Sequence, residues 1–579
     1  MAFTSPLLSY DGATSALTLT TGLSNPSADT VSLSEVVSGR LRVSLGTATF
    51  DVFSTKDDSR FVYSTPNNPG ASTYVDILLS SLTTAPLPLA SFAIDPGAGA
   101  DSVTVNVPTL SLGRFSVTEN ATDGTALTVI AANASGFDGT ARTIAVTGRL
   151  NSSGGSAGVT LTATGGGLSV VGGSVFSGSN AIALSGDGRA TGTDGVRLSE
   201  ANLSTFGPGG IRITGTGGAG ATGVSVGDGS QVTTAERGDI VIDGTGGAAG
   251  NGVFIGGTRI GPNMTTDSST VRASGRTFAG GSPAIIITGT ASAGASDIAV
   301  QDSGVVGSMF GAGPVSFIAD SVNIGTGIAS AAGTVLASTF GVRTRTAGRA
   351  IDLGGTDSAT ALGLTSAELN RVTASRIDIG TRTGGITVSS DIVGPADTSF
   401  ALGADGDTGN IKFLGGFTLT PGRTAPTLTL KAPGGGLIQP LRSGADITGA
   451  TTLAPSSTLA VDINGTVPNT GYSRLVVAGT LGVADALLKL TGTYAPVVGD
   501  TFAIVSSSAL TGTFRNLAQD ATLIFNGRTL RVNYTATGVV LTVLDTTVVP
   551  PPPAPVHLSA VSFGPHVIAY DEDGSVCDW

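Results

Sequence analysis

The sequence predicts an all-β protein, a right-handed parallel β-helix (β-solenoid), and three observations lead to this prediction. Apolar-x-apolar segments recur along the middle of the chain, and glycine-rich segments separate them. The 579 residues also combine 87 glycines and 40% hydrophobic residues with only 12% charged ones, whereas a disordered glycine-rich chain would be poor in apolar residues. Short strands that stack on one another satisfy all three observations, because stacking buries the apolar side of each strand.

The repeat in the middle of the chain sets the expected geometry. The first apolar segment of each unit begins 29 to 45 residues after the previous one, and the second follows its partner by 13 to 15 residues. Near-constant spacing within a unit is typical of a solenoid with surface insertions. Because strand side chains alternate between faces, the isoleucines that open the first segments should form one buried ladder. The first segments begin at Ile144, Ile182, Ile211, Ile240 and Ile285, and the second at Val159, Val196, Val224, Val253 and Ile298.

Changes in composition divide the chain into four predicted regions. A solenoid end is an open edge that needs a cap, which is the role expected of the first region. Within the repeats, Thr365 and Glu368 have the spacing of a capping box and predict one short helix around residues 365–369. The regions are an N-terminal β cap at 1–110, parallel β-helix repeats at 111–440, a β-strand block at 441–546, and a proline-rich linker with a short tail at 547–579.

Charge and cysteine content exclude several classes of function. The net charge is −12 and the basic residues are scattered, whereas nucleic-acid binding needs a basic stripe. The single cysteine, Cys577, leaves the body of the chain without a disulfide or a thiolate metal site. No stretch reaches the roughly 18 apolar residues of a membrane span. The first residues lack the basic and apolar regions of a signal peptide. We expect no nucleic-acid partner and no membrane span in this chain.

Candidate catalytic and metal-binding residues are sparse. Glycan-cleaving sites need clustered carboxylates, and no acidic ladder stands at the outward strand positions of the repeat. Both histidines, His557 and His566, lie beyond the proline spacer. A calcium-binding nonapeptide pattern occurs once, at 97–103, but such a site forms between successive copies. Isolated acidic turns at 405–407 and 571–574 complete no ligand set. We therefore predict no catalytic residue, no cofactor and no metal site. Thermal melts with and without excess chelator should coincide.

The outward strand positions of two neighbouring units are apolar. Elsewhere in the repeat these positions are mostly small or charged, but Val241, Phe254 and Ile286 are large and apolar. We predict that the three form one contiguous patch, which soluble proteins usually cover or use. The insertion at 256–283 is the expected cover, a partner chain is the second option, and tolerated exposure is the third. These are the only site residues that the sequence singles out, as a partner or loop contact.

Two segments carry patterns of a known group of proteins. Residues 364–388 contain Leu-Thr-Ser-Ala-Glu-Leu-Asn, then Arg-Ile-Asp-Ile-Gly and Gly-Ile-Thr-Val. This segment resembles a recurring unit of the β-helices in bacterial surface proteins of the filamentous-haemagglutinin and autotransporter-passenger type. Residues 457–544 are similar to the autotransporter-associated β-strand ending. The pattern there runs through Tyr472 to Val477, Gly499 to Phe502, Leu510 to Phe514, Asn533-Tyr534, and Val540 to Val543.

The resemblance implies a surface location and a scaffold or adhesive role. From it we expect a non-enzymatic extracellular or cell-surface scaffold or adhesin of a bacterium, which exposes loops from a rigid β-solenoid stalk. Two alternatives stay open, a carbohydrate-active β-helix (a polysaccharide lyase or hydrolase) and a purely structural surface-fibre subunit. The expected partners are a host, cell-surface or polysaccharide ligand, or a second copy of the chain.

Overall fold

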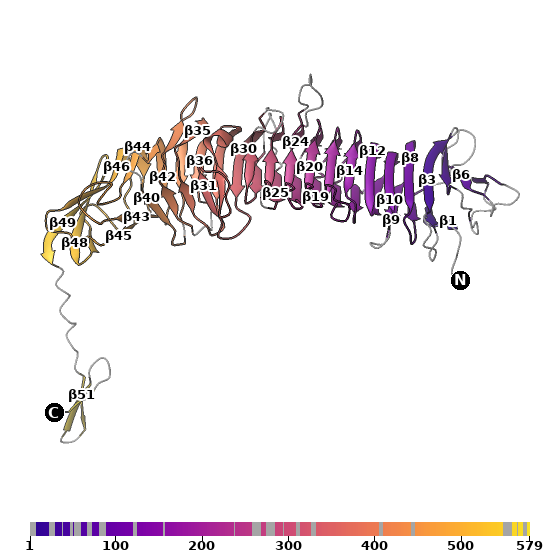
Figure 1. Cartoon of the computed structure of the whole chain (residues 1–579). Helices are drawn as coiled ribbons and strands as arrows, with labels where there is room; N and C mark the ends of the chain where they lie inside the picture. Colours follow the sequence, from indigo (N-terminus) through magenta and orange to yellow (C-terminus); the bar gives the residue numbers. More distant parts are fainter. Residues whose placement is uncertain are drawn as a thin grey trace.

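The computed structural model shows an all-β protein, as predicted. Its one helix among the described residues, α1 (Ser366–Leu369), begins after the N-cap Thr365 and has both hydrogen bonds of the predicted capping box. Figure 1 shows an elongated body in which the strands lie side by side across the long axis. The described residues are 7–21, 29–36, 39–46, 50, 59–65, 72–79, 89–119, 124–153, 157–236, 238–257, 268–273, 284–292, 294–307, 313–325, 332–403, 409–432, 434–441, 446–547, 559–563, 566–570 and 576–578.

Each turn of the repeat contributes three strands. One turn consists of β16 (Ile182–Asp187), β17 (Val196–Ser199) and β18 (Asn202–Thr205). Each strand pairs in parallel with its equivalent in the next turn. The register places Ile182 beside Ile211, Val196 beside Val224 and Leu203 beside Val232, and these six side chains are buried. Successive turns therefore build three stacks of parallel strands, here called the first, second and third stack.

The first stack runs without a break in its parallel pairing from β2 to β42. Besides β16 it contains β2 (Ala16–Thr20), β7 (Ser91–Asp95), β9 (Arg114–Thr118), β11 (Gly136–Ala141), β13 (Val159–Ala163), β19 (Ile211–Thr216), β22 (Ile240–Thr245), β25 (Ile285–Thr290), β28 (Val315–Ile318), β36 (Ser399–Leu402), β39 (Thr427–Leu430) and β42 (Ala450–Leu453). Two longer strands pass from the third stack into the first and complete it, namely β30 (Thr334–Arg343) and β33 (Val372–Gly380).

The second stack is divided into two parts. Its first part contains β17, β14 (Leu168–Val171), β20 (Val224–Gly227), β23 (Val253–Ile255), β26 (Ile298–Val300) and β29 (Val322–Ile324). A separate seven-stranded sheet then takes the same place in each turn. In spatial order it contains β32 (Ala361–Leu364), β31 (Ala350–Leu353), β34 (Ile386–Val388), β37 (Ile411–Phe413), β40 (Leu437–Pro440), β43 (Thr458–Asp462) and β45 (Leu487–Thr491).

The third stack holds the strands that the sequence pattern did not predict. Besides β18 it contains β15 (Ser174–Ser177), β21 (Gln231–Thr234), β24 (Thr270–Ala273), β27 (Val305–Gly307), and later β35 (Ile392–Ala396), β38 (Phe417–Thr420) and β41 (Ile447–Thr448). Other strands also extend over two stacks, among them β8 (Ser102–Ser111), β10 (Ala126–Ala134) and β12 (Thr143–Ser152) near the N-terminal end, and β44 (Leu475–Gly482) near the C-terminal end.

The expectation of two strands per unit is wrong, because a third strand completes each turn. The third strands β18 and β21 carry only one inward aliphatic residue each, Leu203 and Val232. Their second inward position holds a threonine, and the buried Thr205 and Thr234 donate hydrogen bonds to the carbonyl groups of Gly209 and Gly238 at 2.7 and 2.6 Å. An apolar-x-polar strand gives no apolar-x-apolar pattern, so the sequence repeat did not show it.

The predicted isoleucine ladder is correct in burial but wrong in one member. All five isoleucines are buried, and four of them stand in consecutive register in the first stack. Ile144 instead pairs with Leu168 in the second stack, while Val159 takes its place beside Ile182. The 38-residue step from Ile144 to Ile182 therefore contains more than one turn of strands. Because the sequence pattern does not show the third strand, a step of more than one turn could not be told from a step of one turn.

Both ends of the stacks are closed by antiparallel strands. At the N-terminal end the pairs join β1 (Leu7–Asp11) to β2, and β4 (Arg40–Ser44) to β3 (Thr30–Val36) and to β6 (Tyr74–Leu78), which also pairs with β5 (Phe61–Tyr63). At the C-terminal end β49 (Gly538–Thr547) pairs with β46 (Thr501–Thr511) and with β48 (Arg528–Thr535), which also pairs with β47 (Thr522–Phe525). A small antiparallel sheet follows, made of β50 (Ser559–Phe563), β51 (His566–Tyr570) and β52 (Val576–Asp578).

Parallel pairing continues across two of the predicted region boundaries. Near residue 110, β8 pairs with β10, and near residue 440, β39 pairs with β42 and β40 with β43. The four regions remain predictions about folding units.

Candidate functional site

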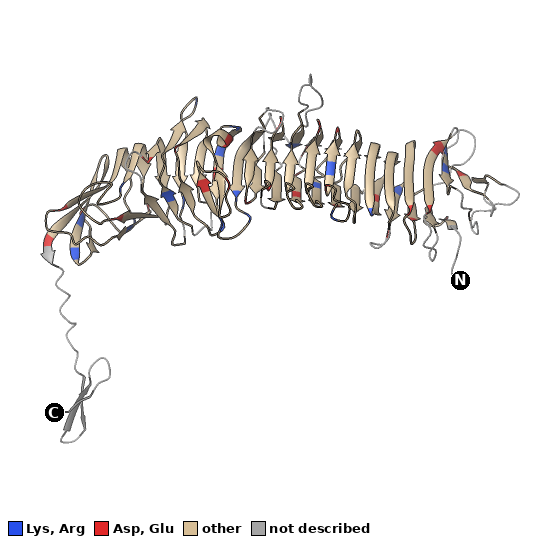
Figure 2. Ribbon diagram, viewed as in Figure 1, with Lys and Arg blue, Asp and Glu red and all other residues tan. Residues whose placement is uncertain are grey.

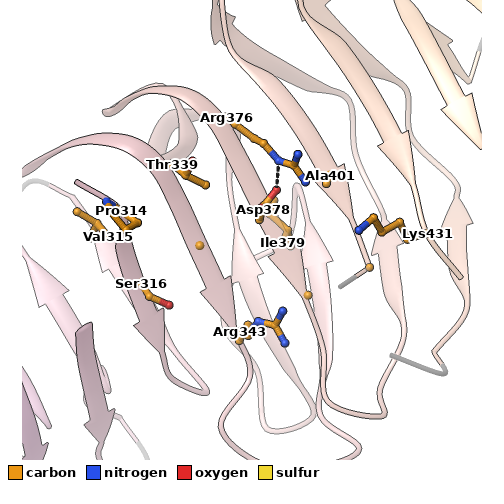
Figure 3. A pocket seen from close by; sticks show the side chains of 13 residues that line it. Pro314, Val315, Ser316, Thr339, Arg343, Arg376, Asp378, Ile379, Ala401 and Lys431 are labelled. Atoms are coloured by element: carbon orange, nitrogen blue, oxygen red, sulfur yellow. Dashed lines mark hydrogen bonds and ion pairs between the residues drawn. The ribbon is translucent and has the colours of Figure 1, made fainter. Parts of the chain in front are cut away.

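The outer surface of the first stack is hollowed between β28 and β39. This feature, here called the cationic hollow, has a volume of about 260 Å³ and is lined from β28, β30, β33 and β36 and by Lys431 after β39. Figure 3 shows Arg343 and Arg376 toward opposite ends of the strands, with Asp378 between them and Lys431 on the far side.

Small residues at neighbouring positions create the hollow. Ser316, Gly341, Asp378 and Ala401 stand in register on four consecutive strands of the first stack. A Cβ added to Gly341 would lie 3.5 Å from Ser316 Oγ, which is an ordinary contact. The glycine is thus not required by backbone crowding, and a larger side chain at residue 341 would fill part of the space.

Arginines dominate the electrostatics of the hollow. The Arg376 Nε donates a hydrogen bond to Asp378 Oδ1 at 2.5 Å, and both side chains are accessible to solvent. The Arg343 side chain is exposed and forms no hydrogen bond or ion pair with another described residue. Lys431 also takes part in an interaction. Figure 2 shows that charged residues are sparse along the ribbon, so three cations around one carboxylate are a local exception in a chain of net charge −12.

A second cavity lies at the corner between the first and second stacks. It has a volume of about 720 Å³ and is lined by Asp297, Asp320 and Asp357 together with Arg345 and Arg349. We call this feature the acidic corner. The outward strand positions of the sequence repeat do not reveal it. These carboxylates stand instead in the corners that join strands.

The carboxylates of the acidic corner bind the backbone of neighbouring turns. Asp297 accepts hydrogen bonds from the N–H groups of Ala291 and Asp320, both at 2.6 Å. Asp320 in turn accepts from the N–H groups of Arg345 and Thr346, at 3.0 and 2.9 Å. Each aspartate therefore satisfies backbone donors that the turn would otherwise leave without a partner.

The pKa values of the three carboxyl groups diverge. Burial raises the pKa of Asp297, although backbone hydrogen bonds oppose the shift. Burial acts in the same direction on Asp320, but hydrogen bonds from Thr346 and the charges of Arg345 and Arg349 outweigh it and lower the pKa. The pKa of Asp357 is raised to about 6, mainly by desolvation of its carboxyl group, although the residue as a whole is exposed. A carboxyl group that titrates near 6 can hold or release a proton near neutral pH.

The hydrogen bonds of the acidic corner belong to a wider pattern. At several corners a side-chain oxygen accepts the backbone N–H of a residue one turn further along the chain. The separations of these pairs are 23 to 45 residues, as expected for bonds between turns. The pairs are Asp194 with Thr222, Asp239 with Ala284, Asn251 with Ser296, Asp297 with Asp320, Asp320 with Arg345, Asp391 with Gly416, Asp397 with Thr424, Asn410 with Leu437 and Asp446 with Val476.

The three residues of the predicted contact patch are half-buried but do not share one stack. Val241 and Ile286 are neighbours in register on β22 and β25 of the first stack. Phe254 lies on β23 of the second stack, between Ser225 and Ala299. Of the insertion 256–283 the structure describes residues 256–257 and 268–273, which include β24 of the third stack.

The candidate calcium residues have separate outcomes. Asp101 is buried, and its Oδ1 accepts the N–H of Asp29 at 2.7 Å, so it joins the first turns of the chain. Residues 405–407 and 571–574 lie outside the described residues. Within the described ranges, no group of three or more His, Cys, Asp or Glu side chains is placed to hold a metal ion.

Residues of the autotransporter-like pattern pack the C-terminal end. The rings of Tyr472 and Phe502 meet edge to face, with centroids 5.4 Å apart. The Tyr534 hydroxyl accepts the N–H of Phe514 at 3.0 Å and donates to the Leu517 carbonyl at 2.8 Å. These aromatic residues hold the closing antiparallel strands against the last turns, a structural use of the pattern.

Comparisons with known proteins add no identity. No family model, curated protein or solved structure matches the chain. No helix in the described part of the chain has the length and apolar character needed to span a bilayer.

Proposed function

We propose that the chain is a right-handed parallel β-helix that acts as a non-enzymatic scaffold or adhesin on the outside of a bacterium. The observation that carries the proposal is the first stack, whose parallel pairing runs unbroken from β2 to β42. Strands stacked in this way make a stiff elongated body, because each turn is bonded to both of its neighbours. Right-handedness follows from the strong preference of parallel crossover connections for that hand.

Two features favour a scaffold over an enzyme. Most carboxylates at the corners accept backbone hydrogen bonds between turns, so they serve cohesion of the stacks. Apart from Val241, Phe254 and Ile286, many outward positions of the regular turns are small, hydroxylated or singly charged, as at Ala183, Arg212 and Ser225. An outer face of this kind provides an extended surface for contacts, and an elongated body displays that surface away from its point of attachment.

Antibody labelling of cells tests the proposal. Antibodies raised against the purified chain should label intact bacteria that export it, without permeabilisation. A matched antibody against a cytoplasmic protein should label only permeabilised cells. Labelling of this chain that appears only after permeabilisation would contradict a surface role.

A carbohydrate-active enzyme is the second candidate, and one observation favours it. The Asp357 carboxyl group, with a pKa of about 6, lines a cavity of about 720 Å³ beside Asp297 and Asp320. A carboxyl group with a raised pKa is the usual general acid of glycoside hydrolysis. Release of reducing ends from polygalacturonate or neutral glucans by the purified chain, abolished in Asp357→Asn, would support the enzyme and overturn the non-enzymatic proposal.

A further inference from the structure

We propose that the cationic hollow binds an anionic polysaccharide through its carboxylate or sulfate groups. This inference rests on the proposed adhesive function and names a ligand class for it. Arg343 and Arg376 carry the argument. Arg343 is exposed and has no partner among the described residues, whereas Arg376 engages only Asp378. An arginine without a carboxylate partner presents its planar fork of donors to an incoming anion.

The geometry suits a polymer lying along the stack. Arg376 pairs with Thr339 and Arg343 with Gly380, so the two arginines stand on adjacent strands, four residues apart in register. At ~3.3 Å per residue, this separates them by about 13 Å along the strands. Successive strands advance by ~4.8 Å along the long axis, close to the length of one sugar ring. A glycan crossing the hollow would therefore meet cations on both of its sides.

The lining favours a glycan over other polyanions. Ser316 and Thr339 supply hydroxyl groups for sugar hydroxyls, and Gly341 leaves room above the sheet. None of the described residues that line the hollow is aromatic, so none of them can stack on nucleic-acid bases. The hollow lies over strands that are paired on both sides, so no free strand edge is offered to an acidic peptide. Its volume of about 260 Å³ fits a short segment of a chain.

Binding of defined polymers to the purified full chain tests the inference. The probes are polygalacturonate, which carries only carboxylates, dextran sulfate, which carries only sulfates, and neutral dextran. We expect surface plasmon resonance to detect one or both polyanions, with affinity that falls as salt rises, and no neutral dextran. The two anionic probes distinguish a uronate-type from a sulfated ligand.

Four variants locate the site. Arg343→Ala combined with Arg376→Ala should weaken binding by about a hundredfold, since each of the two lost charge-assisted contacts removes roughly tenfold. Asp378→Asn should strengthen binding about threefold, because it releases Arg376 and removes a repelling charge. Gly341→Val should weaken binding by filling the hollow. Arg212→Ala, an exposed arginine on β19 of the same stack, should change affinity by less than about twofold.

The outcomes separate this inference from the proposed function. Absence of binding to either polyanion, or equal loss in Arg212→Ala and the double variant, would overturn the polysaccharide site. A gain of binding in Asp378→Asn cannot come from a damaged fold and would support it. Surface labelling of cells tests the scaffold proposal independently. A negative result for the polysaccharide site would therefore leave the scaffold proposal intact.

Discussion

The corners of the regular turns and the acidic corner both connect one strand to the next, but different contacts hold them together. In turns β16 to β25 a ladder of glycines, Gly186, Gly215, Gly244 and Gly289, ends the first-stack strands. A Cβ on any of them would lie 1.9 to 2.1 Å from a carbonyl oxygen across the corner. The two backbones therefore touch, and only glycine fits between them.

Further along the chain, carboxylates replace backbone contact. The corner between β28 and β29 contains Asp320, which accepts N–H groups from Arg345 and Thr346 one turn later. The close contacts of the glycines are between backbone atoms and do not titrate. Carboxylate contacts depend on protonation, and Asp194 and Asp297 add such contacts to two of the glycine corners. The comparison teaches that inward residues set the stacking, while the corner chemistry sets how each part of the stack responds to pH.

The largest expected effect tests the inward residues that both regions share. Ile211→Asp should lower the free energy of unfolding of the surrounding turns by about 4 kcal/mol or more, because it buries an unpaired charge in the first stack. Urea unfolding followed by circular dichroism measures the change. Arg212→Asp, the next residue on the outward face, is the matched control and should cost less than about 1 kcal/mol. Equal effects at both positions would contradict the inward and outward assignment.

The glycine corners are tested by adding one methyl group. Gly244→Ala should destabilise the protein by about 1–3 kcal/mol, because its Cβ would lie 2.1 Å from the Gly252 carbonyl oxygen. Gly227→Ala is the control, since its Cβ would meet nothing closer than 3.8 Å and should change stability by less than about 0.5 kcal/mol. Thermal melts of the two variants, compared at one pH, give the difference. An unchanged melting temperature in Gly244→Ala would contradict the close backbone contact at this corner.

The carboxylate corners are tested by pH. The lowered pKa of Asp320 means that its carboxylate stabilises the fold above the unfolded-state pKa of about 3.9, and that this contribution is lost as pH falls through the folded-state pKa. Asp320→Asn should therefore be less stable than the parent by about 1–2 kcal/mol at pH 7. The gap should close as pH falls below about 4. A gap that persists unchanged at pH 2 would indicate a packing effect.

The smallest expected effect has the opposite sign. The folded-state pKa of Asp357 is raised to about 6, so its ionisation opposes folding, and stability should fall as pH rises from about 4 to about 6. In Asp357→Asn this contribution is absent. The melting temperature of the variant relative to the parent should therefore rise across that window. Calorimetry at pH 4, 5, 6 and 7 measures it. If the melting temperature of the variant relative to the parent instead falls as pH rises, the folded protein stabilises the Asp357 carboxylate, which would contradict its raised pKa.

The sequence by itself determined the all-β class and the burial of the apolar residues that repeat along the first two stacks. The spacing from Ile182 to Ile211 and from Val196 to Val224 is one turn of the chain, and both pairs stand in register. The capping box at Thr365 and Glu368 also formed where it was predicted. These features are local or periodic, so alternation and spacing in the sequence carry them directly.

Only the tertiary structure decided the third stack, the cationic hollow and the acidic corner. Strand β18 has one inward aliphatic residue, and its second inward residue is Thr205. The Thr205 hydroxyl can donate its hydrogen bond only once the folded turn places the Gly209 carbonyl beside it. Arg343 and Arg376 are 33 positions apart in sequence, and Asp297 and Asp320 are 23 apart. Each pair is brought together by the length of a turn, which insertions make irregular. The physical reason is that register between turns, not spacing along the chain, determines which outward and corner side chains meet.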